Sequence, residues 1–201
     1  MLAFCDCAIG SGFATFVTML FTEIRFAVFF VICLSVYWTL KRTSHRHVFL
    51  LVMSYIFYAG WDVRFLALIA YSTAVTYIVS HLLRDAPSAQ RRRRVLIVTI
   101  VMQLASLFFF KYFDFAFENV AALLAATGLS GNWSAPDILL PVGISFFTFQ
   151  AISYLVDVSR GDTQVRSGLR DVALYIAFFP QLVAGPIVRS TDFMPQLDED
   201  K

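Results

Sequence analysis

Two apolar segments of the chain, residues 139–150 and 178–189, contain prolines, glycines and polar side chains that would interrupt a membrane-spanning helix. A proline has no backbone donor and clashes with the preceding turn, so each one leaves a carbonyl that another group must satisfy. Lipid cannot do this, and broken backbone at membrane depth persists only where it is buried in protein or lines a wet cavity. The polar members of the two segments, with those just downstream of the first, are Ser145, Thr148, Gln150, Tyr154, Asp157 and Gln181.

Paired interruptions of this kind point to a binding cavity within a membrane protein, but plainer interpretations exist. The segment 178–189 could be a kinked helix or a surface loop. Ser145 could bond to a carbonyl of its own helix. Asp157 lies three residues before Arg160 and could form a surface ion pair. These alternatives stay open on the sequence alone.

The remaining reactive side chains do not form a catalytic or metal-binding pattern. His45 and His47 alternate in a basic loop without a nearby carboxylate, so we expect ordinary loop residues. His81 ends an apolar stretch and fits a membrane interface better than a catalytic site. Cys5 and Cys7 lack a second pair of metal ligands. The sequence also lacks a glycine-rich phosphate loop and a nucleophile elbow, so it predicts no catalytic residue and no bound metal.

Composition indicates an integral membrane protein. Hydrophobic residues make up 59% of the 201 residues, charged residues make up 15%, and the mean hydropathy is +0.71. These values lie well outside those of soluble domains. The 22 Phe and 8 Tyr are typical of membrane spans and their interfaces. We therefore predict an all-α membrane protein of one domain, with Cys33 packed as a small hydrophobe inside a span.

About five to six transmembrane helices are expected, together with the broken helical segments. The predicted spans are Ile24–Leu40, Val48–Gly60, Val63–Leu83, Val95–Phe110 and Ile138–Val158. Ser72, Thr76 and Ser80 recur at every fourth position, and we expect this face to contact a neighbouring helix rather than a substrate. A polar loop is predicted over residues 84–94, and an interfacial helix in the first half of 116–137.

The distribution of charge predicts the orientation of the chain. If each predicted span crosses once, the loops 41–47, 84–94 and 159–171 share one side and hold 11 of the 16 Lys and Arg residues. By the positive-inside rule, that side is cytoplasmic. The run Arg91–Arg94 is therefore interpreted as an orientation signal, and no nucleic acid partner is expected.

Several motifs closely resemble those of the membrane-bound O-acyltransferase family. They are Leu140–Gln150, Ile152–Gly161 and Phe178–Arg189, and their resemblance is best to the bacterial alginate O-acetylase branch. Ser54–Trp61 and Phe110–Phe113 fit the same branch.

The resemblance implies domain boundaries. Residues 19–197 are expected to form the N-terminal portion of an acyltransferase domain, preceded by an upstream extension over 1–18 and followed by a truncated tail over 198–201. We expect no fold-closing element in the mostly polar residues Asp192–Lys201. Members of the family are more than twice as long as this chain, and their catalytic histidine lies in the second half. No histidine here matches it, so this chain by itself is expected to be inactive.

The resemblance also implies a tunnel that passes acetyl groups from a cytoplasmic donor toward an extracellular polysaccharide such as alginate. Its expected wall residues are Ser145, Gln150, Tyr154, Pro180, Gln181, Gly185 and Pro186. Acetyl-CoA or another acyl donor would be a substrate rather than a bound cofactor. The expected partners are membrane lipid, the donor on the cytoplasmic side, and an extracytoplasmic acceptor protein or polysaccharide. The expected location is the bacterial cytoplasmic (inner) membrane, crossed several times.

Two other functions are compatible with the residues. Half of a transporter or channel would also use broken helices, although it would predict an internal repeat that the sequence lacks. A non-catalytic membrane scaffold could bind a partner through the basic loops.

Overall fold

The computed structural model describes residues 24–60, 62–126, 143–184 and 188–198. All regular secondary structure in these ranges is helical, which confirms the predicted all-α class for this part of the chain. The elements are α1 (Ile24–Thr39), α2 (Thr43–Ala59), the 3₁₀ helix η2 (Val63–Phe65), α3 (Leu66–Arg84), α4 (Ala89–Ala126), α5 (Ile144–Arg160), α6 (Leu169–Ala177), α7 (Phe179–Ala184) and α8 (Ser190–Asp198).

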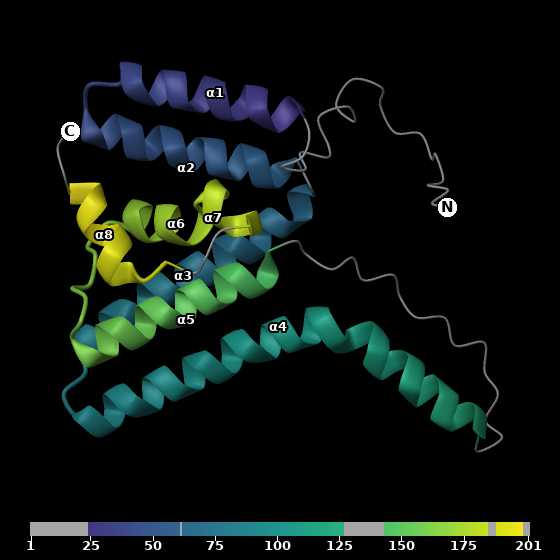
Figure 1. Ribbon diagram of the computed structural model, residues 1–201. Helices are drawn as coiled ribbons and strands as arrows, with labels where there is room; N and C mark the ends of the chain where they lie inside the picture. The colour runs from purple at the N-terminus through teal and green to yellow at the C-terminus, as the bar shows by residue number, and fades with distance from the viewer. Residues whose placement is uncertain (1–23, 61, 127–142, 185–187, 199–201) are drawn as a thin grey trace.

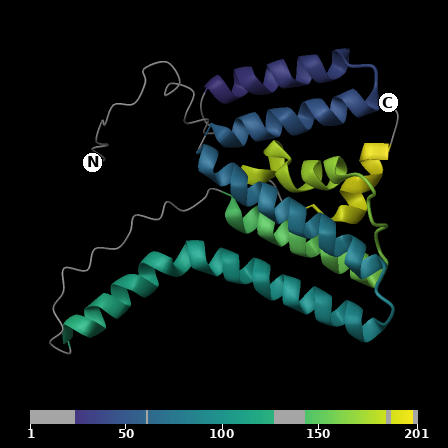
Figure 2. The ribbon, with the colours of Figure 1, turned by 180° about the vertical axis from the view of Figure 1, so that it is seen from behind.

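The helices are arranged in rows (Figure 1). Helices α1 and α2 lie side by side at one margin, and α3 packs on α5 on the other side of the molecule. The short helices α6, α7 and α8 lie between these two pairs, and α6 contacts both α2 and α3. The view from behind shows α4 at the opposite margin, where it runs along α5 and then diverges from it (Figure 2).

The core surrounds the short central helices. Every residue of α6 from Val172 to Ala177 is buried, although α6 has only 9 residues. A second cluster joins Phe29 of α1, Phe57 of α2 and Phe179 of α7, whose rings lie 5.4 to 5.7 Å apart. Cys33 belongs to this cluster and is buried with a free thiol, as predicted.

Local capping sets several helix ends. The side chain of Asp62 accepts from the backbone N–H of Arg64 at 2.8 Å and begins η2. Ser88 accepts from the N–H of Arg91 at 3.2 Å and begins α4. Helix α5 ends at Gly161, whose φ of 84° lies in the left-handed region that glycine adopts readily.

Two helical stretches of the described chain are long and apolar enough to cross a membrane, namely Val63–Arg84 and Ala89–Phe113. Phe26–Thr39 is a shorter apolar helix. The predicted packing face of α3 is confirmed, because Ser72, Thr76 and Ser80 are buried and Ser72 accepts from Gln103 Nε2 of α4 at 3.3 Å. In lipid, such hydrogen bonds and small residues are what hold neighbouring helices together.

The prediction of a polar loop over 84–94 is partly wrong. Helix α4 begins at Ala89, so Arg91–Arg94 are helical rather than looped. Capping by Ser88 explains this early start, because a hydroxyl at this position satisfies one of the free N–H groups of the first turn. The helix expected in the first half of 116–137 exists as the continuation of α4 to Ala126.

The expectation that Asp192–Lys201 contain no fold-closing element is wrong for the described residues of this range. Residues 190–198 form α8, and its side chains Phe193, Met194 and Leu197 are buried against the core. Their spacing places them on one helix face. Asp198, the first residue of the expected tail, ends this helix. The expected extension over 1–18 lies outside the described residues.

Candidate functional site at the broken helix

The segment 178–189 is interrupted where the sequence predicts it. Helix α6 ends at Ala177, Phe178 is extended with φ −60° and ψ 107°, and α7 begins at Phe179. Pro180 in the first turn of α7 has no N–H, so a helix continuing through it would lack one hydrogen bond. The break lies in the interior, since Ala177 and Phe179 are both buried. The surface-loop alternative is therefore excluded for this part of the segment.

The backbone groups released by the break bind side chains of two other helices. In an unbroken helix, the N–H of Phe179 would donate to the carbonyl of Tyr175. Here that carbonyl accepts from Gln150 Nε2 of α5 at 2.7 Å, and the Phe179 N–H donates to Ser54 Oγ of α2 at 3.2 Å. The Ser54 hydroxyl in turn donates to the Leu50 carbonyl at 2.7 Å. Broken backbone is thus satisfied by protein rather than by lipid.

Gln150 also connects the two interrupted segments. Its Nε2 donates to Gln181 Oε1 at 3.0 Å, so an amide from each segment meets at the break. Gln150 is buried and Gln181 is half-buried. Because both donor hydrogens of the Gln150 amide can be used here, the arrangement fixes its orientation.

A close backbone approach joins the same two segments. Gly143 caps the N-terminus of α5 with φ 77°, a left-handed conformation that disfavours other residues. A Cβ atom added at Gly143 would lie 2.8 Å from the carbonyl oxygen of Leu182 in α7. Glycine is therefore required both by its conformation and by the contact with α7.

The other predicted wall residues lie elsewhere. Ser145 is half-buried and, with Phe149 and side chains of α4, lines an apolar groove of about 800 Å³. The Tyr154 hydroxyl accepts from the N–H of Arg166 at 3.2 Å, near the other end of α5. Pro180 lines a small pocket of about 220 Å³ between α1 and α7. The structure thus brings Gln150 and Gln181 together, whereas the predicted residues Gly185 and Pro186 lie outside the described chain.

Near the C-terminal end of α5, three side chains are connected by hydrogen bonds that the sequence did not indicate. The Asp157 carboxylate accepts from Ser190 Oγ at 2.7 Å, and that hydroxyl lies 3.1 Å from Thr163 Oγ1. Asp157 and Ser190 are both buried. The surface ion pair proposed between Asp157 and Arg160 is wrong, because among the described residues Arg160 forms no ion pair. No periodic signal links Ser190 to Asp157, 33 residues earlier.

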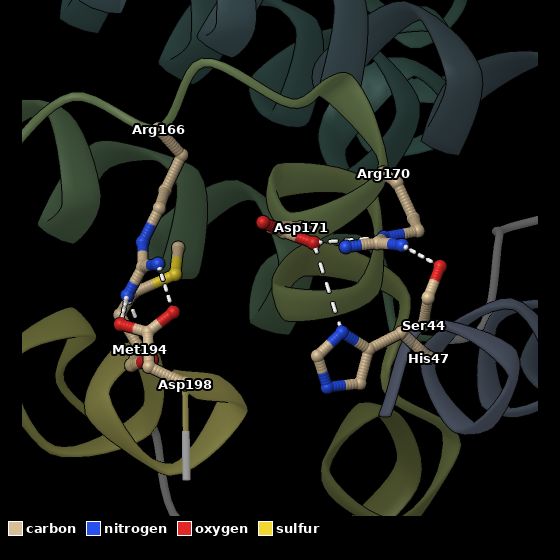
Figure 3. Close-up of polar contacts among 7 residues, drawn as sticks. All are labelled: Ser44, His47, Arg166, Arg170, Asp171, Met194 and Asp198. Carbon is tan, nitrogen blue, oxygen red and sulfur yellow. Dashed lines mark hydrogen bonds and ion pairs between the residues drawn. The ribbon is translucent and has the colours of Figure 1, made fainter. Parts of the chain in front are cut away.

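Two arginines hold α8 and α2 to the loop and helix after α5 (Figure 3). Arg166 forms a bidentate pair with Asp198, at 2.6 and 2.7 Å, and donates to the Met194 carbonyl. This pairing lowers the pKa of Asp198. Arg170 bonds to Asp171 at 2.9 Å and reaches Ser44 of α2 at 2.8 Å.

His47 departs from its expected role as an ordinary loop residue. It is buried in α2, and its Nδ1 lies 3.9 Å from Asp171 Oδ1 (Figure 3). Burial, followed by the positive charge of Arg170, lowers the pKa of His47, and the Asp171 carboxylate opposes this shift without outweighing it.

His81 donates from Nδ1 to the Tyr77 carbonyl at 2.9 Å. No group of potential metal ligands occurs among the described residues.

Three connections lie along the same edge of the molecule: α1–α2, α3–α4 and α5–α6 (Figure 1). These are the basic regions that the charge count places together. The described residues therefore define a helical membrane protein with its basic connections at one edge and an interrupted helix buried in its interior.

Comparison with known proteins gives the family. The chain is 39% identical over 174 residues to the protein named Probable alginate O-acetylase AlgI of Pseudomonas putida. The aligned region covers 85% of this chain and 35% of that protein. For the protein of the same name in Pseudomonas aeruginosa, the identity is 38% and the shares are 85% and 33%. A Peptidoglycan O-acetyltransferase of Helicobacter pylori is 29% identical over 183 residues, which is 79% of this chain and 34% of that protein. No family model and no solved structure matches.

The chain belongs to the membrane-bound O-acyltransferase family, as the resemblance of its motifs implies. It spans about a third of the length of the curated relatives that it matches.

Proposed function

We propose that this chain is the N-terminal part of a membrane O-acyltransferase, which passes acetyl groups across the bacterial inner membrane for O-acetylation of an extracellular polysaccharide such as alginate. The observation that carries this proposal is the similarity to alginate O-acetylases over 85% of the chain. The donor is acetyl-CoA or another acyl donor on the cytoplasmic side, and the acceptor is extracytoplasmic.

The proposed orientation follows the basic connections. Helices α1 to α5 each cross the membrane in this proposal, and the edge carrying the α1–α2, α3–α4 and α5–α6 connections faces the cytoplasm. The interrupted segments then lie at the other end of α5 and in the interior of the bundle.

The proposed role of the described residues is structural support for a path through the protein. Acyl transfer requires a general base that deprotonates the acceptor hydroxyl. We assign no such base among the described residues, and we place that step in the part of the enzyme that this chain does not span. The chain by itself would then be inactive. Gln150 and Gln181 supply amide groups beside the break, where they hold α7 in place and present polarity to the proposed tunnel.

A chimeric enzyme tests the proposal. The region of the Pseudomonas putida alginate O-acetylase that aligns with this chain is replaced by this chain's residues, in an alginate-producing strain that lacks its own O-acetylase. We expect the chimera to restore acetate esters on the secreted alginate, and we expect the 201-residue chain alone to restore none. The measurement is ester-bound acetate per uronic acid.

The same strain distinguishes other outcomes. Acetylated peptidoglycan with unmodified alginate would move the proposed acceptor toward that of the Helicobacter pylori relative. A chimera that accumulates in the inner membrane at the level of the parent enzyme, and yet acetylates neither polymer, would contradict the proposed role of this region.

A further inference from the structure

Four consecutive arginines occupy the first two turns of α4. They are Arg91, Arg92, Arg93 and Arg94, and the helix that carries them begins at Ala89. Successive residues of an α-helix point about 100° apart, so four in a row surround the helix axis. A cation near a helix N-terminus also opposes the helix dipole. The position of this run is therefore unfavourable unless a negatively charged partner is present.

One of the four arginines has a structural role. The Nε of Arg92 donates to the Leu83 carbonyl at 3.2 Å, near the C-terminal end of α3. The other three, Arg91, Arg93 and Arg94, are exposed, and no ion pair within the described part of the chain involves them. The start of α4 thus carries one arginine that bonds to α3 and three arginines that are exposed.

The outward arginines stand at the end of an apolar helix face. Residues four apart share a face, so Arg93 precedes Ile97 and Arg94 precedes Val98. Ile97 and Val98 are 49% and 66% exposed, and Val101 one turn later is 59% exposed.

The opposite face of α4 is covered by protein. Thr99 and Gln103 are buried there, and Gln103 bonds to Ser72 of α3. Figures 1 and 2 show α4 at the margin of the bundle, with neighbours on one side. Among the described residues nothing covers its apolar outer face, and the three outward guanidinium groups lie at the end of that face.

We infer that Arg91, Arg93 and Arg94 form a binding site for the phosphate of an anionic phospholipid whose acyl chains lie along Ile97, Val98 and Val101. Guanidinium groups bind phosphate through paired, charge-assisted hydrogen bonds. Basic residues next to a span also attract the anionic lipids of the cytoplasmic leaflet. Charge complementarity selects this occupant over a zwitterionic lipid. The inference rests on α4 crossing a bilayer, and it is independent of acyl transfer.

The test uses the full 201-residue chain purified in a neutral detergent. Phosphatidylglycerol and phosphatidylcholine are titrated separately as mixed micelles, and bound lipid is measured by native mass spectrometry and by the rise in melting temperature. We expect phosphatidylglycerol to bind at least about tenfold more tightly than phosphatidylcholine. The triple variant Arg91→Gln/Arg93→Gln/Arg94→Gln is expected to lose this preference.

Three matched variants isolate the site. Lys41→Gln/Arg42→Gln/Arg160→Gln removes the same charge from other exposed positions and should keep the preference. Arg92→Gln should lower the melting temperature in every lipid without changing the preference, because it breaks the bond to the Leu83 carbonyl. Replacing the three outward arginines by lysine should keep most of the preference, since the charges remain; this variant also gives a result if the glutamine variant fails to fold.

Several outcomes would overturn the inference. One is an unchanged preference in the triple glutamine variant, and another is an equal loss in the Lys41, Arg42 and Arg160 variant. Absence of a lipid preference together with tight binding of polyglutamate would favour an acidic protein partner instead. The chimera's acetylation assay does not enter this test, so failure of one leaves the other unaffected.

Discussion

Gln150 Nε2 donates to the carbonyl of Tyr175 at 2.7 Å, and this bond replaces the helical bond that the Phe179 N–H would have made. The same amide group bonds to Gln181 at 3.0 Å. A side chain of one interrupted segment thus completes the backbone bonding of the other. The break between α6 and α7 is stable because its polar groups are paired inside the protein.

Replacing Gln150 by leucine should lower the free energy of unfolding by about 1–3 kcal/mol, because the buried Tyr175 carbonyl loses its donor. Gln181→Leu is the matched control, since it removes only the bond between the two amides, and we expect a loss of about 1 kcal/mol. Denaturant titration in mild detergent measures both. Equal losses in the two variants would show that the carbonyl bond is not the main contribution.

Gly143→Ala should destabilise the chain more than Gly161→Ala. Both glycines have positive φ, at 77° and 84°, so both substitutions carry a conformational cost of about 1 kcal/mol. At Gly143 the new Cβ would lie 2.8 Å from a backbone atom, the Leu182 oxygen, whereas no atom of the described residues outside the local turn lies within 4 Å of a Cβ at Gly161. Melting temperatures of the two variants give the comparison. An equal decrease would mean that α7 shifts away without cost.

The melting temperature should fall as the pH is lowered from about 7.5 to about 5.5, and His47 should account for part of the decrease. The folded state lowers the pKa of His47 from the ordinary value of 6.5. The unfolded chain therefore binds a proton first, so this stability is complete above about pH 6.5 and is lost progressively below it. His47→Asn should flatten the dependence in this window. His45→Asn, at an exposed position two residues earlier, is the matched control variant.

Ser190→Ala should cost about 2 kcal/mol of unfolding free energy, because the buried Asp157 carboxylate loses a hydrogen-bond donor at 2.7 Å. Thr163→Val removes the hydroxyl that contacts Ser190 and should lower the unfolding free energy by less, since the bond from Ser190 to the carboxylate remains. Chemical denaturation distinguishes the two. If Thr163→Val proves the more damaging, the bond between Ser190 and Asp157 is not the principal support of α8.

Cysteine labelling should place Ser88 and Val63 on opposite sides of the membrane, because α3 separates them. The background carries alanine at Cys5, Cys7 and Cys33. An impermeant thiol reagent applied from the outside should label Val63→Cys, which is 64% exposed, and should label Ser88→Cys only after the membrane is permeabilised. Labelling of both positions from the same side would contradict the proposed crossing by α3.

Features that depend on local chemistry could be predicted from the order of the amino acids. Pro180 lacks a backbone donor whatever surrounds it, so the interruption near residue 180 could be predicted. The four-residue spacing of Ser72, Thr76 and Ser80 likewise follows from helix geometry. All three are buried, and Ser72 contacts the neighbouring helix α4. The grouping of the basic loops follows from the count of crossings and agrees with the common edge in Figure 1.

The contacts between groups far apart in the sequence depend on how the helices pack and could not be predicted. Gln150 and Tyr175 are 25 residues apart, and Asp157 and Ser190 are 33 apart. No periodicity connects such positions, because the packing of one helix on another sets these distances. His47 seemed an ordinary loop residue for the same reason: its carboxylate neighbour, Asp171, lies more than a hundred residues later. Pro180 allows the break to be predicted from the sequence. The packing of α2 and α5 against the break determines which side chains bond to its free backbone groups.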